Sequence, residues 1–130
     1  GGEYGASTGR PRRVGPIDLV ATRYGCRIQG ATEVALTKLD VLSYMKEIPV
    51  CTQYEVNGEK TDDFPFTAVI DGAKPVLTTV PGWGCDISGV RKYEDLPQAA
   101  RDYVEYVEQA IGVHISYVSV GAGRDEIIYR

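Results

Sequence analysis

Residues 95–112 read DLPQAARDYVEYVEQAIG, and VHISYV, residues 113–118, follows directly. In the first stretch apolar side chains recur every three or four positions, which is the period of one helix face. These side chains are Leu96, Ala99, Ala100, Tyr103, Val104, Val107 and Ile111. Gly112 is of the residue type that most often ends a helix, and the next six residues predict a strand. A helix from 95 to 111 that leads into a strand is the unit of an α/β fold.

The same alternation of helix and strand precedes this stretch. Pro16 stands where a helix begins, apolar residues follow at helical spacing up to Ile28, and Gly30 ends the segment. Residues 34–37 form a short apolar run, which predicts a strand buried on both faces. Residues 41–45 predict a brief helical turn.

The middle of the chain has the period of two that is typical of strands. Alternate residues from Ile48 to Val56 are apolar or β-branched, and Asn57-Gly58 is the preferred dipeptide of a type I′ hairpin turn. Residues 64–70 and 76–80 are further strand candidates, and a proline in or beside each places them at sheet edges or strand starts. We therefore predict an α/β fold: a mixed sheet with flanking helices and an antiparallel β-hairpin subdomain.

Composition restricts the function classes. The 130 residues carry 14 Lys and Arg against 18 Asp and Glu, a net charge of −4 that argues against a general nucleic-acid binder. No apolar run approaches the roughly 20 residues that span a bilayer, and we expect no membrane partner and no signal peptide. The spacing of Cys26, Cys51 and Cys85 does not suit zinc, so we expect reduced thiols and a cytoplasmic location. We expect the single histidine, His114, to lie partly exposed at a strand start.

Two polar strings carry the functional signal. Ser7-Thr8-Gly9-Arg10-Pro11-Arg12-Arg13 lies in a glycine-rich opening loop, and its guanidiniums offer forked donors that match carboxylates and phosphates. Thr37-Lys38-Leu39-Asp40 closes the apolar run before it. The Asp40 carboxylate can accept from guanine N1–H and the 2-amino group, while the Lys38 stem covers the purine. Together the strings predict a site for a guanine nucleotide and at least one other anion.

Each string also has a simpler interpretation. The Lys-x-Asp string is compatible with an exposed turn in which Asp40 caps the next helical segment. The arginine cluster is compatible with a solvated basic turn or with a nucleic-acid contact.

Several blocks of residues extend the pattern from Gly2 to Asp125. They are Gly2–Arg13, Leu36–Leu42, Pro81-Gly82-Trp83, Leu96–Ala100, Ser119-Val120-Gly121 and Gly123-Arg124-Asp125. In these blocks and their order the chain resembles the adenylosuccinate synthetase family. Its members are GTP-dependent ligases of purine biosynthesis that join IMP to L-aspartate. The family's polypeptide is considerably longer, so the chain looks like its C-terminal portion only.

The resemblance implies roles for individual residues. The aspartate-binding loop would consist of Ala6, Ser7, Thr8, Gly9, Arg10 and Arg12. Arg10 would also reach IMP, and Arg12 would also lie near GTP. Guanine would be held by Lys38, Leu39 and Asp40 and by a second loop, Ser119, Val120 and Gly121. Ala122 stands where family members commonly carry Pro, so we expect a less rigid loop and weaker guanine binding.

The resemblance also implies what lies outside this chain. No Gly-x-x-x-x-Gly-Lys phosphate loop is present, and the family's catalytic residues, Mg²⁺ ligands and most IMP contacts belong to its upstream part. We therefore expect no catalytic residue, no metal ligand and no turnover from these residues alone, within a larger P-loop-NTPase-like ligase. We expect the full-length parent to be a homodimer that uses Mg²⁺. A stand-alone guanine-nucleotide-binding module is the alternative function.

We expect three functional segments. Residues 1–47 would bind aspartate and guanine, 48–93 would be an antiparallel β insertion, and 94–130 would carry the C-terminal helix, strands and guanine loop.

Overall fold

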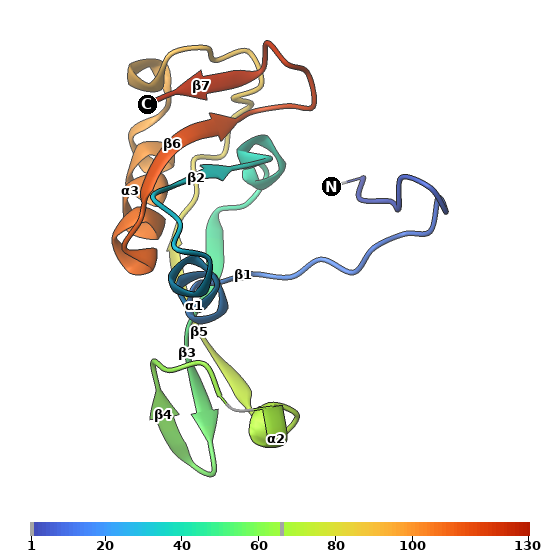
Figure 1. Ribbon diagram of the computed structural model, residues 1–130. Coiled ribbons are helices and arrows are strands. Elements are labelled where there is room, and N and C mark those ends of the chain that lie inside the picture. Colours follow the sequence, from blue (N-terminus) through green and yellow to red (C-terminus); the bar gives the residue numbers. More distant parts are fainter. Residues whose placement is uncertain (1, 66) are drawn as a thin grey trace.

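A computed structural model of the chain describes residues 2–65 and 67–130. Gly1, in the expected opening loop, and Phe66, in the expected strand 64–70, lie outside the described residues. Two mixed β-sheets with helices packed against them make up the described fold (Figure 1). The prediction of an α/β fold with a mixed sheet, flanking helices and an antiparallel hairpin is confirmed.

The first sheet is built around β3, Glu47–Val56. On one side β3 pairs antiparallel with β4, Glu59–Thr61, and on the other with β5, Lys74–Pro81. A short strand that the sequence pattern missed, β1 at Ile17–Asp18, adds a parallel pairing to β3. The C-terminal half of β3, together with β4, extends away from the body of the molecule (Figure 1).

The hairpin turn has the predicted geometry. Asn57 and Gly58 have φ angles of 53° and 82°, the left-handed values that a type I′ turn requires. The strand predicted over 64–70 is wrong, because α2, Thr67–Ile70, is a single helical turn. α2 lies in the connection between β4 and β5, and both of these strands pair with β3 and not with residues 67–70.

The second sheet has the strand order β2-β6-β7. β2, Glu33–Leu36, runs parallel to β6, His114–Ser119, and β7, Ile127–Tyr129, runs antiparallel to β6. The expectation that the first of these strands is buried on both faces is wrong, since exposed and half-buried residues alternate along β2. β2 is an edge strand, and only one of its faces packs on the core.

The first helix, α1, spans Leu19–Gln29 and starts later than Pro16 suggested. The delay has a local cause: residues 17–18 pair with β3, and Asp18 Oδ1 then accepts a hydrogen bond of 2.9 Å from the Ala21 amide as the N-cap. Gly30 ends α1 in the left-handed conformation, as predicted.

The long helix α3 spans Gln98–Ile111 and joins the two sheets into one core. A turn of 3-10 helix, η2 at Tyr93–Asp95, precedes it, and Gly112 ends it with φ of 70°. Its predicted apolar stripe is buried against side chains of both sheets, apart from Ala99, which is half-buried. The core side chains at this contact include Tyr103, Val104, Val107, Ile48, Val50, Ile115 and Val118.

Candidate functional site

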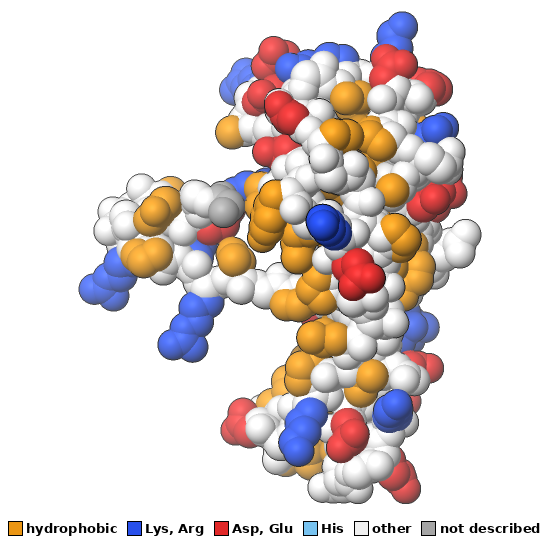
Figure 2. Space-filling view, turned by 180° about the vertical axis from the view of Figure 1, so that it is seen from behind, with side chains coloured by type: hydrophobic (Ala, Val, Ile, Leu, Met, Phe, Trp, Pro, Cys, Tyr) orange, Lys and Arg blue, Asp and Glu red, His pale blue; other side chains and the backbone are white. Residues whose placement is uncertain are grey.

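The arginine string lies on an N-terminal segment, residues 2–16, that projects from the body of the molecule and is called the arm below (Figures 1 and 2). Residues 6–16 are all exposed, and Figure 2 shows Lys and Arg side chains on this arm. Backbone hydrogen bonds fold the arm on itself: the Gly5 amide donates to Arg10 O at 2.8 Å, and the Arg12 amide donates to Glu3 O at 3.0 Å. The Thr8 hydroxyl accepts from the Arg10 amide at 3.4 Å. The arm therefore presents its guanidiniums from a closed loop.

A carboxylate on the arm connects the two polar strings. Glu3 Oε1 lies 2.6 Å from Lys38 Nζ, and Glu3 Oε2 lies 3.7 Å from an Arg12 nitrogen. The hydrogen bond from Lys38, and then its charge, hold the pKa of Glu3 below its ordinary 4.5. Sequence reasoning placed Glu3 in a family-like block but gave it no role, because no spacing rule links a loop carboxylate to a lysine 35 residues later.

The Lys-x-Asp string follows the end of β2, where the backbone turns sharply. Lys38 has φ of 61° and ψ of 38°, and its amide donates to Ser119 Oγ at 2.7 Å. Because β2 and β6 are parallel neighbours, their carboxyl ends lie at the same edge of the sheet. The structure thus brings the two segments expected to hold guanine, 37–40 and 119–121, into direct contact.

Asp40 lies in a 3-10 turn, η1, which spans Leu39–Leu42 and starts two residues before the helical turn predicted at 41–45. Its Oδ1 atom is buried and has no hydrogen-bond partner among the described residues. The N-cap position of η1 is Lys38, so Asp40 does not cap this turn. A buried acceptor without a partner costs free energy, and a ligand donor at this oxygen removes that cost.

Two of the expected guanine contacts have their side chains in the core. Leu39 and Val120 are 1% and 0% exposed. Only the backbone of either residue is left to meet a nucleotide.

Residues of the arm and of the segment 36–45 line a hollow of about 520 Å³, whose mainly apolar lining includes Glu3 and Lys38. Its volume suits a small molecule. Asp40 and residues 119–121 are not among the residues that line it, so this hollow is not where the predicted base contacts converge.

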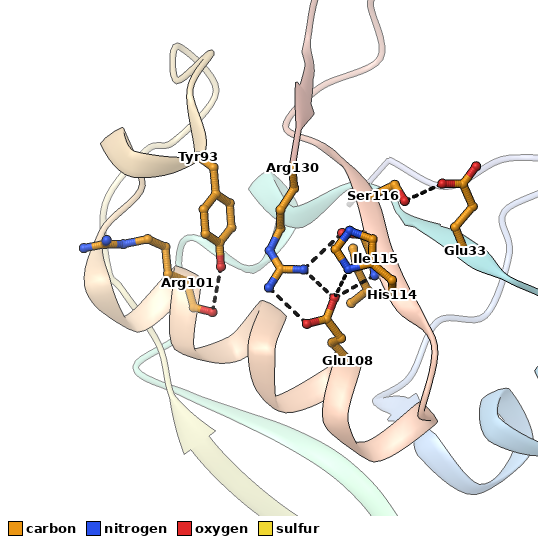
Figure 3. Close-up of polar contacts among 8 residues, drawn as sticks. All are labelled: Glu33, Tyr93, Arg101, Glu108, His114, Ile115, Ser116 and Arg130. Carbon is orange, nitrogen blue, oxygen red and sulfur yellow. Dashed lines mark hydrogen bonds and ion pairs between the residues drawn. The ribbon is translucent and has the colours of Figure 1, made fainter.

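A second polar cluster lies at the C-terminal end of α3 and holds parts of the fold together (Figure 3). Glu108 Oε2 accepts from the Ile115 amide at 2.8 Å and contacts His114 Nδ1 at 2.8 Å, while both Glu108 oxygens pair with Arg130. The Arg130 guanidinium in turn lies 5.0 Å from the centre of the Tyr93 ring. His114 starts β6 and is exposed, as expected. The cluster ties β7 to α3 and β6.

Comparison of the sequence with models of known protein families assigns the chain to one family. The family model described as adenylosuccinate synthetase matches residues 1–128. The chain belongs to the adenylosuccinate synthetase family. It is 49% identical to an adenylosuccinate synthetase of Mycobacterium sp. (strain KMS) over 131 residues, 100% of this chain and 30% of that protein. It is 46% identical to one of Frankia alni over 129 residues, 98% of this chain and 30% of that protein.

The fold also agrees with that of a solved family member. The fully ligated adenylosuccinate synthetase of Plasmodium falciparum superposes with a TM-score of 0.92 at 32% identity, over 98% of this chain and 31% of that one. The chain therefore spans about a third of the length of the adenylosuccinate synthetases that it matches.

Proposed function

We propose that this chain supplies the guanine-recognition and aspartate-binding parts of an adenylosuccinate synthetase, which joins IMP to L-aspartate using GTP in purine biosynthesis. The observation that carries the proposal is the buried Oδ1 atom of Asp40, which has no hydrogen-bond partner within residues 2–65 and 67–130. Asp40 lies two residues after Lys38. The Lys38 amide donates a hydrogen bond to Ser119, which belongs to the other segment expected to hold guanine. Guanine offers two neighbouring N–H donors to such a carboxylate, whereas adenine does not.

On the guanine side, Asp40 accepts from N1–H and the 2-amino group, and the Lys38 stem lies over the purine. Backbone N–H groups of the loop at 119–121 meet the oxygen of the base, apart from that of Val120, which donates to Glu126 O. Leu39 and Val120 take part through their backbone, because both side chains are buried in the core. The Ser119 hydroxyl holds the Lys38 backbone in its left-handed turn.

On the aspartate side, Thr8, Arg10 and Arg12 bind the amino acid, and Ala6, Ser7 and Gly9 shape the loop around it. Arg10 also reaches IMP, and Arg12 also lies near GTP. A forked cation between two anions lowers their mutual repulsion during phosphoryl transfer, which gives this double use a physical reason.

We propose Mg²⁺ as the cofactor of the whole enzyme, but the residues described here do not fit it. Within 2–65 and 67–130, no group of three or more His, Cys, Asp and Glu residues is placed to hold a metal ion. Asp40 has an unpartnered oxygen but no such neighbours, so no step of this proposal passes through a metal.

We further propose that the full-length parent is a cytoplasmic homodimer of a larger P-loop-NTPase-like fold, with this chain as its C-terminal portion and with no nucleic-acid or membrane partner. The three cysteines Cys26, Cys51 and Cys85 are free thiols, which suits a reducing compartment. None of the helices that the structure describes is long and apolar enough to cross a bilayer. We propose for residues 1–47, 48–93 and 94–130 the three roles that the sequence leads us to expect.

The test is product formation from defined substrates. The full-length polypeptide that carries these residues, given IMP, GTP, Mg²⁺ and L-aspartate, should release adenylosuccinate and GDP, and omission of GTP or aspartate should stop both. Residues 1–130 alone should show no turnover, because the general base and phosphate cradle belong to the rest of the enzyme. No product from the full-length polypeptide, or turnover by residues 1–130, would contradict the proposal.

A further inference from the structure

The loop that follows β6 is folded around the carboxyl group of one residue, Glu126. Its Oε2 atom accepts a hydrogen bond of 2.5 Å from the Gly123 amide. Its backbone closes the loop twice: the Val120 amide donates to Glu126 O at 2.9 Å, and the Glu126 amide donates to Gly123 O at 3.1 Å. Residues 120–123 are thus tied to Glu126 at both ends by backbone and side chain.

The Glu126 carboxylate also explains why a residue without a side chain occupies position 121. A Cβ atom on Gly121 would lie 2.4 Å from Glu126 Cδ and Oε2, far inside van der Waals contact. The φ angle of Gly121 is not in the left-handed region, so backbone conformation does not demand glycine there. A side chain at position 121 would therefore have to displace the Glu126 carboxylate, which is packed against the α-carbon.

We propose that Glu126 is a positioning residue that sets the shape of the guanine loop. The inference rests on the proposed function, in which backbone N–H groups of the 119–121 loop other than that of Val120 meet the base oxygen. Ala122 lacks the fixed φ of a proline, and the hydrogen bonds to Glu126 supply the constraint instead. From this loop the Ser119 hydroxyl reaches the Lys38 amide, so the same contacts also support the Lys-x-Asp turn.

The Glu126 side chain acts on the base only through the 119–121 loop. Its removal should therefore weaken the binding of GTP and leave the binding of the other substrates nearly unchanged. In the full-length polypeptide, Glu126→Ala should raise KM for GTP by about tenfold, the range for loss of one charge-assisted hydrogen bond. The kcat value and KM for aspartate should change less than about twofold, since the arm keeps its own hydrogen bonds. Glu126→Gln, whose amide oxygen still accepts from the Gly123 amide, should recover most of the lost affinity. Glu105→Gln, an exposed change on α3, is the matched control.

A double-mutant cycle tests the contact itself. Gly121→Ala should raise KM for GTP because the new methyl group displaces the carboxylate. The double variant Gly121→Ala with Glu126→Ala should bind GTP no worse than Glu126→Ala alone, because the clash disappears with the carboxylate. Effects that add would overturn the proposal.

Hydrogen exchange of the nucleotide-free protein gives a readout that needs no ligand. The Gly123 amide should exchange about tenfold faster in Glu126→Ala than in the wild type, with the melting temperature nearly unchanged. An unaltered exchange rate and KM for GTP, a lower KM for GTP, or an equal loss with every substrate at a lowered melting temperature would each overturn the role of Glu126. If the wild-type polypeptide makes no adenylosuccinate, the proposed function fails, and with it the guanine role of Glu126.

Discussion

The Nζ atom of Lys38 lies 2.6 Å from Oε1 of Glu3, and this ion pair joins the projecting arm to the turn after β2. The same carboxylate reaches Arg12 through its other oxygen. One acidic side chain therefore links the residues proposed to bind aspartate with those proposed to bind guanine.

Replacement of Glu3 by Gln should loosen this connection. In the full-length polypeptide the variant should show a severalfold higher KM for aspartate, because the arm loses its ionic tie to Lys38. Glu59→Gln on the exposed end of the hairpin is the control, and steady-state kinetics with varied aspartate is the measurement. A KM equal to that of the control would show that the arm is positioned without Glu3.

The same ion pair should depend on pH in a defined direction. The pKa of Glu3 is lowered in the folded protein, so the ion pair is fully formed above the ordinary value of 4.5 and is lost as pH falls through the lowered one. The protection factors of the arm amides, which correct for the intrinsic pH dependence of exchange, should fall across that acidic window in the wild type. In Glu3→Gln this pH-dependent loss of protection should be absent.

Arg12 and Arg13 form a matched pair for the aspartate loop. Arg12→Leu should remove most activity and raise the apparent KM for aspartate, since a carboxylate loses a bidentate partner worth roughly 1.5–3 kcal/mol. Arg13→Leu should matter much less, because Arg13 is not among the residues proposed to bind aspartate. Equal and small effects of both substitutions would show that the cluster is a solvated turn.

Glu108 is expected to matter for stability and not for binding. Glu108→Gln weakens the bonds to Arg130 and the Ile115 amide and should lower stability by roughly 1.5–3 kcal/mol, the usual cost for hydrogen bonds to a charged group. Thermal denaturation compared with Glu105→Gln measures the loss, and KM values should stay unchanged. A melting temperature equal to that of the control would contradict the structural role.

Arg130 and the other donors lower the pKa of Glu108 from 4.5 to about 2. A depressed carboxyl pKa stabilises the fold above pH 4.5, and that stabilisation is lost as pH falls through about 2. The difference in melting temperature between wild type and Glu108→Gln should therefore shrink progressively between these values. A constant difference would show that ionisation of Glu108 is not its source.

Much of the fold follows from local sequence patterns. The α3 stripe, the Asn57-Gly58 turn and the glycine ends of both long helices are set by residues close together in the chain, and all are confirmed. The pairing of Ile17–Asp18 with β3 depends on a partner more than 30 residues later in the chain, and no local pattern carries that information. The helical turn at 67–70 also differs from the local pattern, which is typical of a strand.

The candidate site likewise has a part that the sequence indicates and a part that only the structure shows. Residue types and family-like blocks singled out the arm, Lys38, Asp40 and the 119–121 loop. The contacts of Glu3 with Lys38 and of Glu126 with its glycines arise only when segments fold together, so their roles were visible only in three dimensions.

The most direct test of guanine recognition is nucleotide selection by Asp40→Asn in the full-length polypeptide. An Asn amide presents one oxygen and one NH₂, so a donor would face a donor of guanine, at a cost to GTP of roughly 2–4 kcal/mol. Xanthine carries a carbonyl at position 2, to which that amide can donate. Asp71→Asn, at an exposed position, is the control.

The measurement is kcat/KM with GTP and with XTP at saturating IMP and aspartate. We predict that Asp40→Asn loses most of its use of GTP, gains use of XTP relative to wild type, and keeps its KM for aspartate. Unimpaired use of GTP by Asp40→Asn would contradict guanine recognition by Asp40, because the buried Oδ1 atom would then not read the base.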